Sequence, residues 1–174
     1  MLLEKQGLLN TKLKINISIE KEADDLLMIN IVNQKQLEIP SYWRLTDVVG
    51  IPPLEIGIDC QKGFISTITV FVDGFAVKKL GNINASIFEG AVLVNTDIFK
   101  RTNDYIDVNQ SYDIYYGKSK LICSFAKIND FVQGFKMDRV VVFTNDENQI
   151  AGFSICDLSE NEKNLIKSII QRNE

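Results

Sequence analysis

Residues 54–74 read LEIGIDCQKGFISTITVFVDG, and this stretch decides the fold class. Its first five residues alternate apolar side chains with small or polar ones, which is the period of a β-strand with one face in a core. Residues 61–63 predict a tight reversal, because Gly63 accepts the positive φ that a turn with a bulge requires. Residues 64–73 are rich in β-branched and aromatic side chains on both faces, so we expect this strand inside a sheet.

The same alternation recurs along the chain. Residues 13–19 and 26–32 predict one hairpin across an acidic turn, and residues 138–144 and 149–156 predict another. Further strands are expected at residues 91–99, 111–116 and 118–127.

Other segments are expected to lack regular strands. Residues 40–53 contain Pro40, Pro52 and Pro53, so they predict a connection in which Trp43 covers one end of the core. Residues 75–80 are consistent with a short strand or a turn, and residues 81–90 predict a loop. A helical turn is expected around Phe131, Val132 and Phe135.

One helix is predicted near the end of the sequence. Ser159-Glu160-Asn161-Glu162 matches a capping box, in which Ser159 and Glu162 satisfy each other's backbone N–H groups. The apolar stripe that follows comprises Leu165, Ile166, Ile169 and Ile170. A helix this short is marginal alone and is expected to dock on the sheet.

These elements predict a mainly β (α+β) fold in a single globular domain over residues 1–174. The expected architecture is a curled antiparallel sheet, barrel or sandwich of about ten strands, because closure or stacking protects the edges of so many strands. The C-terminal amphipathic helix is expected to pack on it.

Composition narrows the functions available. The chain of 174 residues contains no histidine, which removes histidine-based nucleophile activation and most transition-metal sites. Cys60, Cys123 and Cys156 lack metal-ligand spacing and are expected to be core side chains. No long apolar run and no export signal is visible, so a cytoplasmic location and no membrane association are expected. The net charge of −4 argues against a nucleic-acid partner and suits a basic protein.

Motifs for phosphate binding or paired-acid catalysis are weak. The glycines show no phosphate-loop spacing, so no cofactor is expected. The acidic pairs Asp24-Asp25, Asp104 with Asp107, and Asp146-Glu147 stand in turn-like contexts, where aspartate is favoured for its backbone hydrogen bonds. Their structural interpretation is favoured over a hydrolytic or Mg²⁺ site.

Residues 103–117 form the candidate recognition segment, since four of the chain's five tyrosines fall within it. Tyrosine offers a large contact area at low entropic cost, and neighbouring carboxylates would complement a basic partner. Alternation places Tyr112, Ile114 and Tyr116 on one face and Asp113 and Tyr115 on the other; tyrosine is also simply a good strand former. The candidate partner-binding residues are Asp104, Tyr105, Asp107, Tyr112, Asp113, Tyr115 and Tyr116.

The sequence from Pro53 to Ile65, and the terminal VVFTNDENQIAGFSICDLSENEKNLIKSII, resemble bacterial immunity proteins of polymorphic-toxin and contact-dependent growth inhibition systems. The matching positions are fold-forming, and they cover about a third of the chain. They are Leu54, Ile56, Ile58, Gly63, Ile65, Leu158, Ser159 and Glu162.

The resemblance implies a non-catalytic protein, monomeric or weakly dimeric, that neutralises a cognate toxin domain, often a nuclease, by occlusion. No cofactor or metal is implied. Two alternatives stay open from the residues themselves: a β-barrel that binds a small ligand inside, and a carboxylate-dependent hydrolase. A filled interior, a ligand cavity or an acid-lined cleft would distinguish the three.

Overall fold

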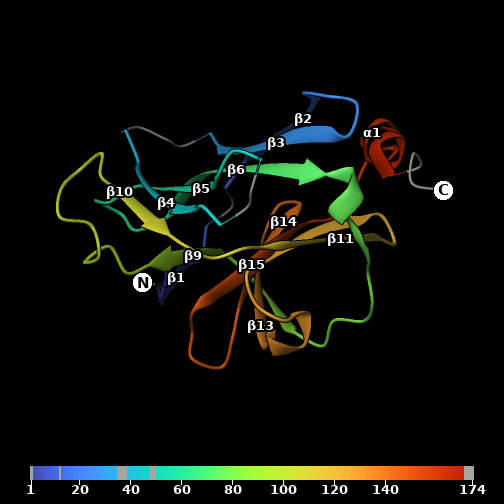
Figure 1. The fold of residues 1–174 in the computed structure, drawn as a ribbon. Helices are drawn as coiled ribbons and strands as arrows, with labels where there is room; N and C mark the ends of the chain where they lie inside the picture. Colours follow the sequence, from blue (N-terminus) through green and yellow to red (C-terminus); the bar gives the residue numbers. More distant parts are fainter. Residues whose placement is uncertain (1, 12, 35–38, 48–49, 171–174) are drawn as a thin grey trace.

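The computed structural model describes residues 2–11, 13–34, 39–47 and 50–170, which form two β-sheets packed as a sandwich (Figure 1). The six-stranded sheet contains, in spatial order, β10 (Tyr105–Val108), β4 (Ser41–Leu45), β5 (Leu54–Ile58), β6 (Ile65–Asp73), β3 (Leu26–Asn33) and β2 (Ile15–Lys21). The seven-stranded sheet contains β7 (Lys78–Lys79), β11 (Asp113–Gly117), β12 (Lys120–Ser124), β15 (Ile150–Ile155), β14 (Val140–Thr144), β13 (Gln133–Met137) and β8 (Ser86–Glu89).

A two-stranded sheet of β1 (Lys5–Leu9) and β9 (Ala91–Val94) adjoins both large sheets through contacts of β9 with β6 and β13. A sandwich with a C-terminal helix confirms the predicted fold class. The described strands do not close into a barrel. None of the helices in the described part of the chain has the length and apolar character that crossing a bilayer requires.

The stretch that predicted the fold forms the hairpin β5–β6, as expected. Gly63 has a φ of 74°, and the buried Asp59 carboxylate accepts hydrogen bonds of 3.0 Å from the backbone N–H groups of Gln61 and Lys62. Strand β6 lies between β5 and β3, inside the sheet. The predicted hairpins β2–β3 and β14–β15 are also confirmed.

The inner faces of the two large sheets share one aliphatic and aromatic core. Trp43 is 1% exposed, and its ring lies 5.7 Å from that of Phe125, which follows β12. The core role predicted for Trp43 is therefore confirmed, and the indole joins the two sheets.

The terminal helix α1 (Glu160–Ile170) begins with the predicted capping box. The Ser159 N–H donates to Glu162 Oε2 at 2.7 Å, and the Glu162 N–H donates to Ser159 Oγ at 3.3 Å. Ile166 and Ile169 of the apolar stripe are buried against β2, β3 and η1 (Gly74–Ala76), a turn of 3₁₀ helix after β6. The helix thus closes one end of the sandwich (Figure 1).

Residues 40–53 are not simply a connection, because they contain β4 between β10 and β5. Pro40 directly precedes the strand, and the other two prolines lie between β4 and β5. No proline therefore occupies a ladder position, and the strand keeps its donors.

Two further segments differ from the prediction. Residues 81–90 contain the edge strand β8, whose four residues are all exposed, so no alternation marked it. The expected helical turn is only η2 (Ile128–Asp130), and Phe135 lies in β13.

The strand count and the strand directions also differ from the prediction. The described residues form 15 strands rather than about ten, since β1, β4, β8, β10 and β13 were not predicted as strands, and the strand expected at residues 91–99 ends at Val94. Three pairings, β10–β4, β11–β7 and β13–β8, are parallel, so both large sheets are mixed.

The outer faces of the two large sheets differ. On the seven-stranded sheet a second apolar cluster, including Ile122 and Phe143, is covered by Leu80, Ile83 and Ala85 of the β7–β8 connection. The outward side chains of the six-stranded sheet are half-buried, as in Tyr42 and Phe71. The described side chains on this outer face therefore stay partly accessible to solvent.

Candidate functional site

The tyrosine-aspartate segment crosses from one sheet to the other, so its candidate residues do not meet in one place. Asp104, Tyr105 and Asp107 lie at β10, the edge of the six-stranded sheet, whereas Asp113 and Tyr115 lie on β11 of the seven-stranded sheet. Figure 1 shows β10 and β11, which carry the two groups, well apart from each other.

The first group forms a network with β4, because parallel pairing places Tyr105 opposite Tyr42 and Asp107 opposite Arg44. The two tyrosine rings stack with centroids 5.3 Å apart, and the Arg44 guanidinium carbon lies 4.7 Å from the Tyr105 centroid. Arg44 donates two hydrogen bonds to the Asp107 carboxylate, at 2.6 and 2.9 Å. We call Tyr42, Arg44, Tyr105 and Asp107 the Tyr105–Arg44 network.

This network is exposed but ordered by its own contacts. Tyr105 is 52% exposed, and Arg44 is held from the other side by Glu55 at 3.7 Å. The hydrogen bond to Asp107 raises the pKa of Arg44, and burial followed by the neighbouring Tyr105 and Glu55 raises the pKa of Tyr42. Neither group is prepared for proton transfer, so the arrangement is suited to recognition rather than acid–base chemistry.

Gly57 leaves room for the Tyr42 ring next to β5. A Cβ at this position would stand 3.2 Å from the Tyr42 ring and would collide with the Thr67 hydroxyl. The absent side chain therefore provides the space over β5 that Tyr42 covers.

Asp104 has a structural role. Its carboxylate accepts from the backbone N–H groups of Lys100 and Tyr105, each at 3.1 Å. The second of these bonds occupies an N–H that would otherwise face outward from the edge strand.

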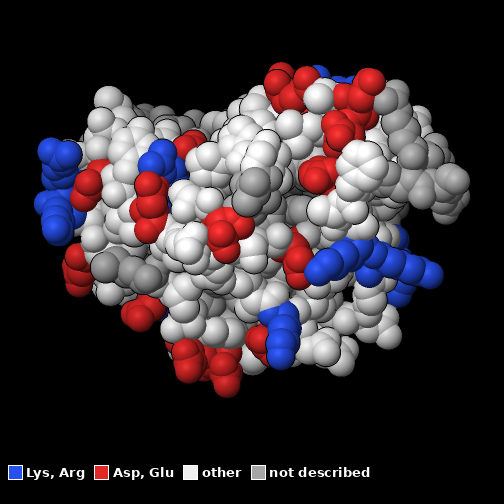
Figure 2. Space-filling model, in the orientation of Figure 1, with Lys and Arg blue, Asp and Glu red and all other residues white. Residues whose placement is uncertain are grey.

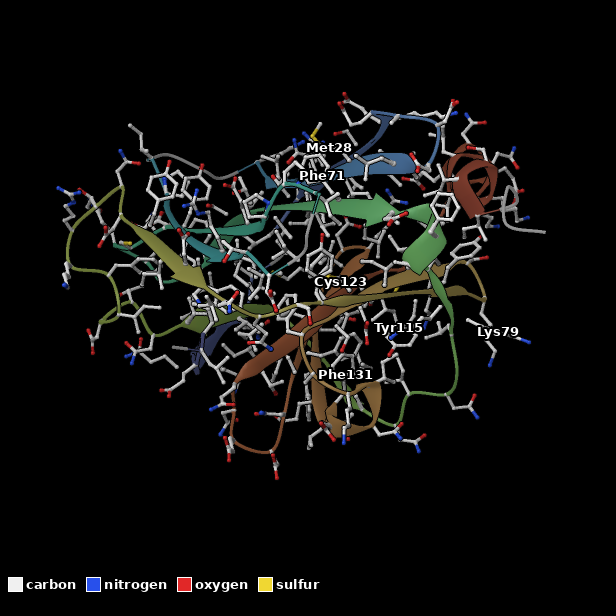
Figure 3. All side chains as sticks on the ribbon, in the orientation of Figure 1. Met28, Phe71, Lys79, Tyr115, Cys123 and Phe131 are labelled. Atoms are coloured by element: carbon white, nitrogen blue, oxygen red, sulfur yellow. The ribbon has the colours of Figure 1, made fainter. Side chains whose placement is uncertain are left out.

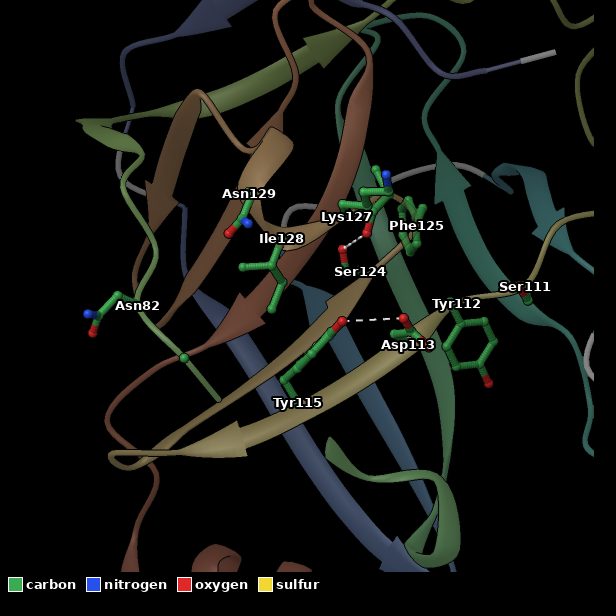
Figure 4. A pocket seen from close by; sticks show the side chains of 12 residues that line it. Asn82, Ser111, Tyr112, Asp113, Tyr115, Ser124, Phe125, Lys127, Ile128 and Asn129 are labelled. Carbon is green, nitrogen blue, oxygen red and sulfur yellow. Dashed lines mark hydrogen bonds between the residues drawn. The ribbon is translucent and has the colours of Figure 1, made fainter. Parts of the chain in front are cut away.

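Asp113 and Tyr115 line a polar depression of about 530 Å³ on the seven-stranded sheet (Figure 4). The Tyr115 hydroxyl donates to Asp113 at 3.3 Å, and Lys78 Nζ lies 2.7 Å from the same carboxylate. The bond to Asp113 raises the pKa of Lys78, and burial followed by Asp113 raises the pKa of Tyr115. The other described lining residues include Asn82, Tyr112, Ser124, Lys127 and Asn129.

Tyr112 and Tyr116 face the core, together with the buried Ile114, as their alternation predicted. The Tyr112 hydroxyl donates to the Phe71 carbonyl at 2.9 Å and so links the two sheets. Burial raises the pKa of Tyr112 far above its usual value. These two tyrosines stabilise the fold, although Tyr112 also borders the depression.

No metal-ligand set is found among the described residues, since no group of three or more Cys, Asp and Glu side chains converges there. All three cysteines are free thiols. Cys123 is fully buried, and burial raises its pKa, which keeps it protonated and inert.

Sequence reasoning missed the partners that complete both groups. Tyr42, Arg44 and Lys78 come from segments that were expected to be irregular or were left open between strand and turn. Their signal exists only in the parallel pairings β10–β4 and β11–β7, which join residues distant along the chain.

No family model matches the sequence, and a search of the curated proteins finds no match either.

Proposed function

We propose that this protein is an immunity protein, which binds a cognate bacterial toxin domain in the cytoplasm and neutralises it by occlusion without catalysis. The observation that carries the proposal is the Tyr105–Arg44 network on the open face of the six-stranded sheet. It presents an exposed aromatic ring whose position is already fixed by an arginine and a second tyrosine.

Such a network suits binding by contact. An aromatic ring that is ordered before binding loses little conformational entropy on association, and tyrosine and arginine dominate the energetics of many interfaces. The shared aliphatic core between the sheets and the open outer face of the six-stranded sheet support a mechanism that uses the exterior. The likeness of residues 53–65 and of the terminal hairpin and helix to immunity proteins supports the same conclusion.

The proposal is tested by co-expression with the product of the gene immediately upstream, with growth as the measurement. We expect that product to be toxic alone and harmless beside this protein. Tyr105→Ala should weaken protection, while Ile87→Ala, which truncates a side chain of equal 52% exposure on β8, should not. An upstream product without toxicity, or toxicity that this protein leaves unchanged, would refute the proposal.

A second candidate function is binding of a small polar ligand in the depression that Asp113 and Tyr115 line, which has a volume typical of ligand pockets. Asp113 is the one carboxylate among its described lining residues, so a two-acid hydrolytic mechanism finds no support there. Protection that survives Asp113→Asn and Tyr115→Phe but is lost with Tyr105→Ala would favour the immunity function.

A further inference from the structure

The opposite end of the six-stranded sheet carries a second surface, which includes Asp25 of the acidic pair Asp24-Asp25. Cross-strand pairing aligns Glu20, Met28 and Phe71 on the outer face of β2, β3 and β6. Figure 3 shows Met28 and Phe71 beside each other there. At the end of these strands the Glu22 N–H donates to the Leu26 carbonyl, and Leu26 lies opposite Asp73. These contacts place the β2–β3 turn next to the end of β6.

This surface ends at Phe75, which is 66% exposed. Two hydrogen bonds fix its backbone: the Gly74 N–H donates to the Asp25 carbonyl at 2.8 Å, and the Phe75 N–H donates to the Asp73 carboxylate at 2.9 Å. Gly74 also packs directly on the Ile169 backbone of α1. We call the surface made by Glu20, Glu22, Asp25, Met28, Phe71 and Phe75 the η1 surface.

No described neighbour neutralises the carboxylates of the η1 surface. The side chains of Glu20, Glu22 and Asp25 form no ion pair with any residue that the structure describes. Lys21, which pairs with Asp24 at 3.4 Å, is the one lysine or arginine in residues 20–30 and 65–75. Figure 2 shows the acidic side chains gathered at the top of the molecule, where Figure 1 places the β2–β3 turn.

We propose that the η1 surface is a docking surface for a basic protein, which places an apolar side chain against Phe75 and lysine or arginine side chains against the surrounding carboxylates. An exposed aromatic centre with a charged rim is the usual arrangement of an interaction hot spot. Charge decides the occupant, because an excess of unpaired carboxylates attracts cations and repels nucleic acid and anionic lipid.

The inference rests on the proposed function only in taking that basic protein to be the toxin domain. Under that assignment the two surfaces have different tasks. The η1 surface accelerates and anchors the encounter through unpaired charge, and the Tyr105–Arg44 network supplies ordered contacts.

The test is a titration of the protein with an amphipathic peptide of lysine and leucine, followed by backbone amide chemical shifts. We expect shifts concentrated in residues 20–28 and 71–76. Phe75→Ala should weaken peptide binding about tenfold, as the loss of a hot-spot aromatic does. The variant should not lower the melting temperature of the protein, because the Phe75 side chain is mostly in solvent.

A matched charge control comes from the β14–β15 turn. Glu20→Gln with Glu22→Gln should weaken peptide binding several-fold, whereas Asp146→Asn with Glu147→Asn, the same change in net charge at another exposed turn, should leave it unchanged. Equal weakening by both pairs, or shifts spread over the whole molecule, would overturn the inference.

The co-expression assay separates this inference from the proposed function. If the upstream product is not neutralised but the peptide maps to the η1 surface, the immunity function fails and the docking surface stands. If the toxin is neutralised and the peptide does not map there, with the Phe75 and Glu20/Glu22 variants still fully protective, the docking surface fails and the immunity function stands.

Discussion

The Tyr105–Arg44 network and the η1 surface lie at opposite ends of one sheet, and they treat charge in opposite ways. In the network, Asp107 is satisfied by two hydrogen bonds from Arg44, which also contacts Glu55 and the Tyr105 ring. On the η1 surface, Glu20 and Glu22 have no ion-pair partner among the described residues. The charges of the first region compensate one another, whereas the glutamates of the second are not compensated by any described residue.

This difference shows that acidic content alone does not identify a surface for a basic partner. A carboxylate that is already paired contributes order but little long-range attraction, whereas unpaired carboxylates repel one another and favour a cationic ligand. The aspartates of residues 103–117 are of the paired kind. Glu20 and Glu22, in contrast, form no ion pair with any described residue.

The largest expected effect is a loss of stability from a substitution beneath the Tyr105–Arg44 network, which should leave the η1 surface unchanged. Trp43→Ala should lower the free energy of unfolding by about 3–5 kcal/mol, because it leaves a cavity beneath β4. Urea denaturation measures the loss. In the folded variant, amide shifts should change around β4, β5 and β10 and remain unchanged around Phe75. A loss below about 1 kcal/mol would mean that the indole does not support the network.

Gly74→Val should act on the other region. A Cβ at Gly74 would meet the Ile169 carbonyl, so α1 and η1 must separate, at a cost of about 1–3 kcal/mol. Gly81→Val is the control, since no atom lies within 4 Å of the position that its Cβ would take. Thermal unfolding compares the two variants, and similar melting temperatures would contradict close packing of η1 on the helix.

The sequence predicted those parts of the fold that depend on local pattern. The β5–β6 hairpin, the turn at Gly63 and the capping box of α1 each follow from residues within a few positions of one another. Strands β4, β8 and β10 were missed because prolines flank the first, and the others are edge strands of only four residues. Edge strands carry the weakest signal, since one side of them faces solvent.

The candidate site was predictable only in part. The tyrosines and aspartates of residues 103–117 could be recognised by type, and the inward direction of Tyr112 and Tyr116 followed from alternation. Their partners could not be found, because Arg44 reaches Asp107 from a strand 63 residues earlier through a parallel pairing. Phe75 gave no signal in the sequence, since its exposure follows from the turn after β6.

The helix that supports the η1 surface should show its own pH dependence. Arg139 donates to Glu162 at 2.9 and 3.0 Å and lowers the pKa of that carboxyl. The stabilisation is therefore complete above the unfolded-state pKa of about 4.3 and is lost as the pH falls through the lower folded-state value.

Glu162→Gln should accordingly lower the free energy of unfolding by about 1–2 kcal/mol at neutral pH, because it removes the ion pair with Arg139 and weakens the helix cap. The loss should be smaller in acid, where the stabilisation by the Glu162 charge is already reduced in the original protein. Denaturation at neutral pH and near pH 3 measures both. Equal decreases in the free energy of unfolding at the two pH values would show that the charge of Glu162 does not contribute to stability. Peptide binding at Phe75 should not change in the folded variant.

The smallest expected effects test the contrast between paired and unpaired charge directly. A double-mutant cycle on Arg44→Leu and Asp107→Asn should give a coupling of about 0.5–1 kcal/mol, typical of an exposed pair with good geometry. Glu20→Gln with Glu22→Gln should instead raise the free energy of unfolding by a few tenths of a kcal/mol, because it relieves repulsion between like charges. The gain should shrink in high salt, where the repulsion is screened, while core contributions stay unchanged. A lower free energy of unfolding in the variant with Glu20→Gln and Glu22→Gln would show that these carboxylates stabilise the fold. The charges of the η1 surface would then be compensated within the protein, as those of the network are.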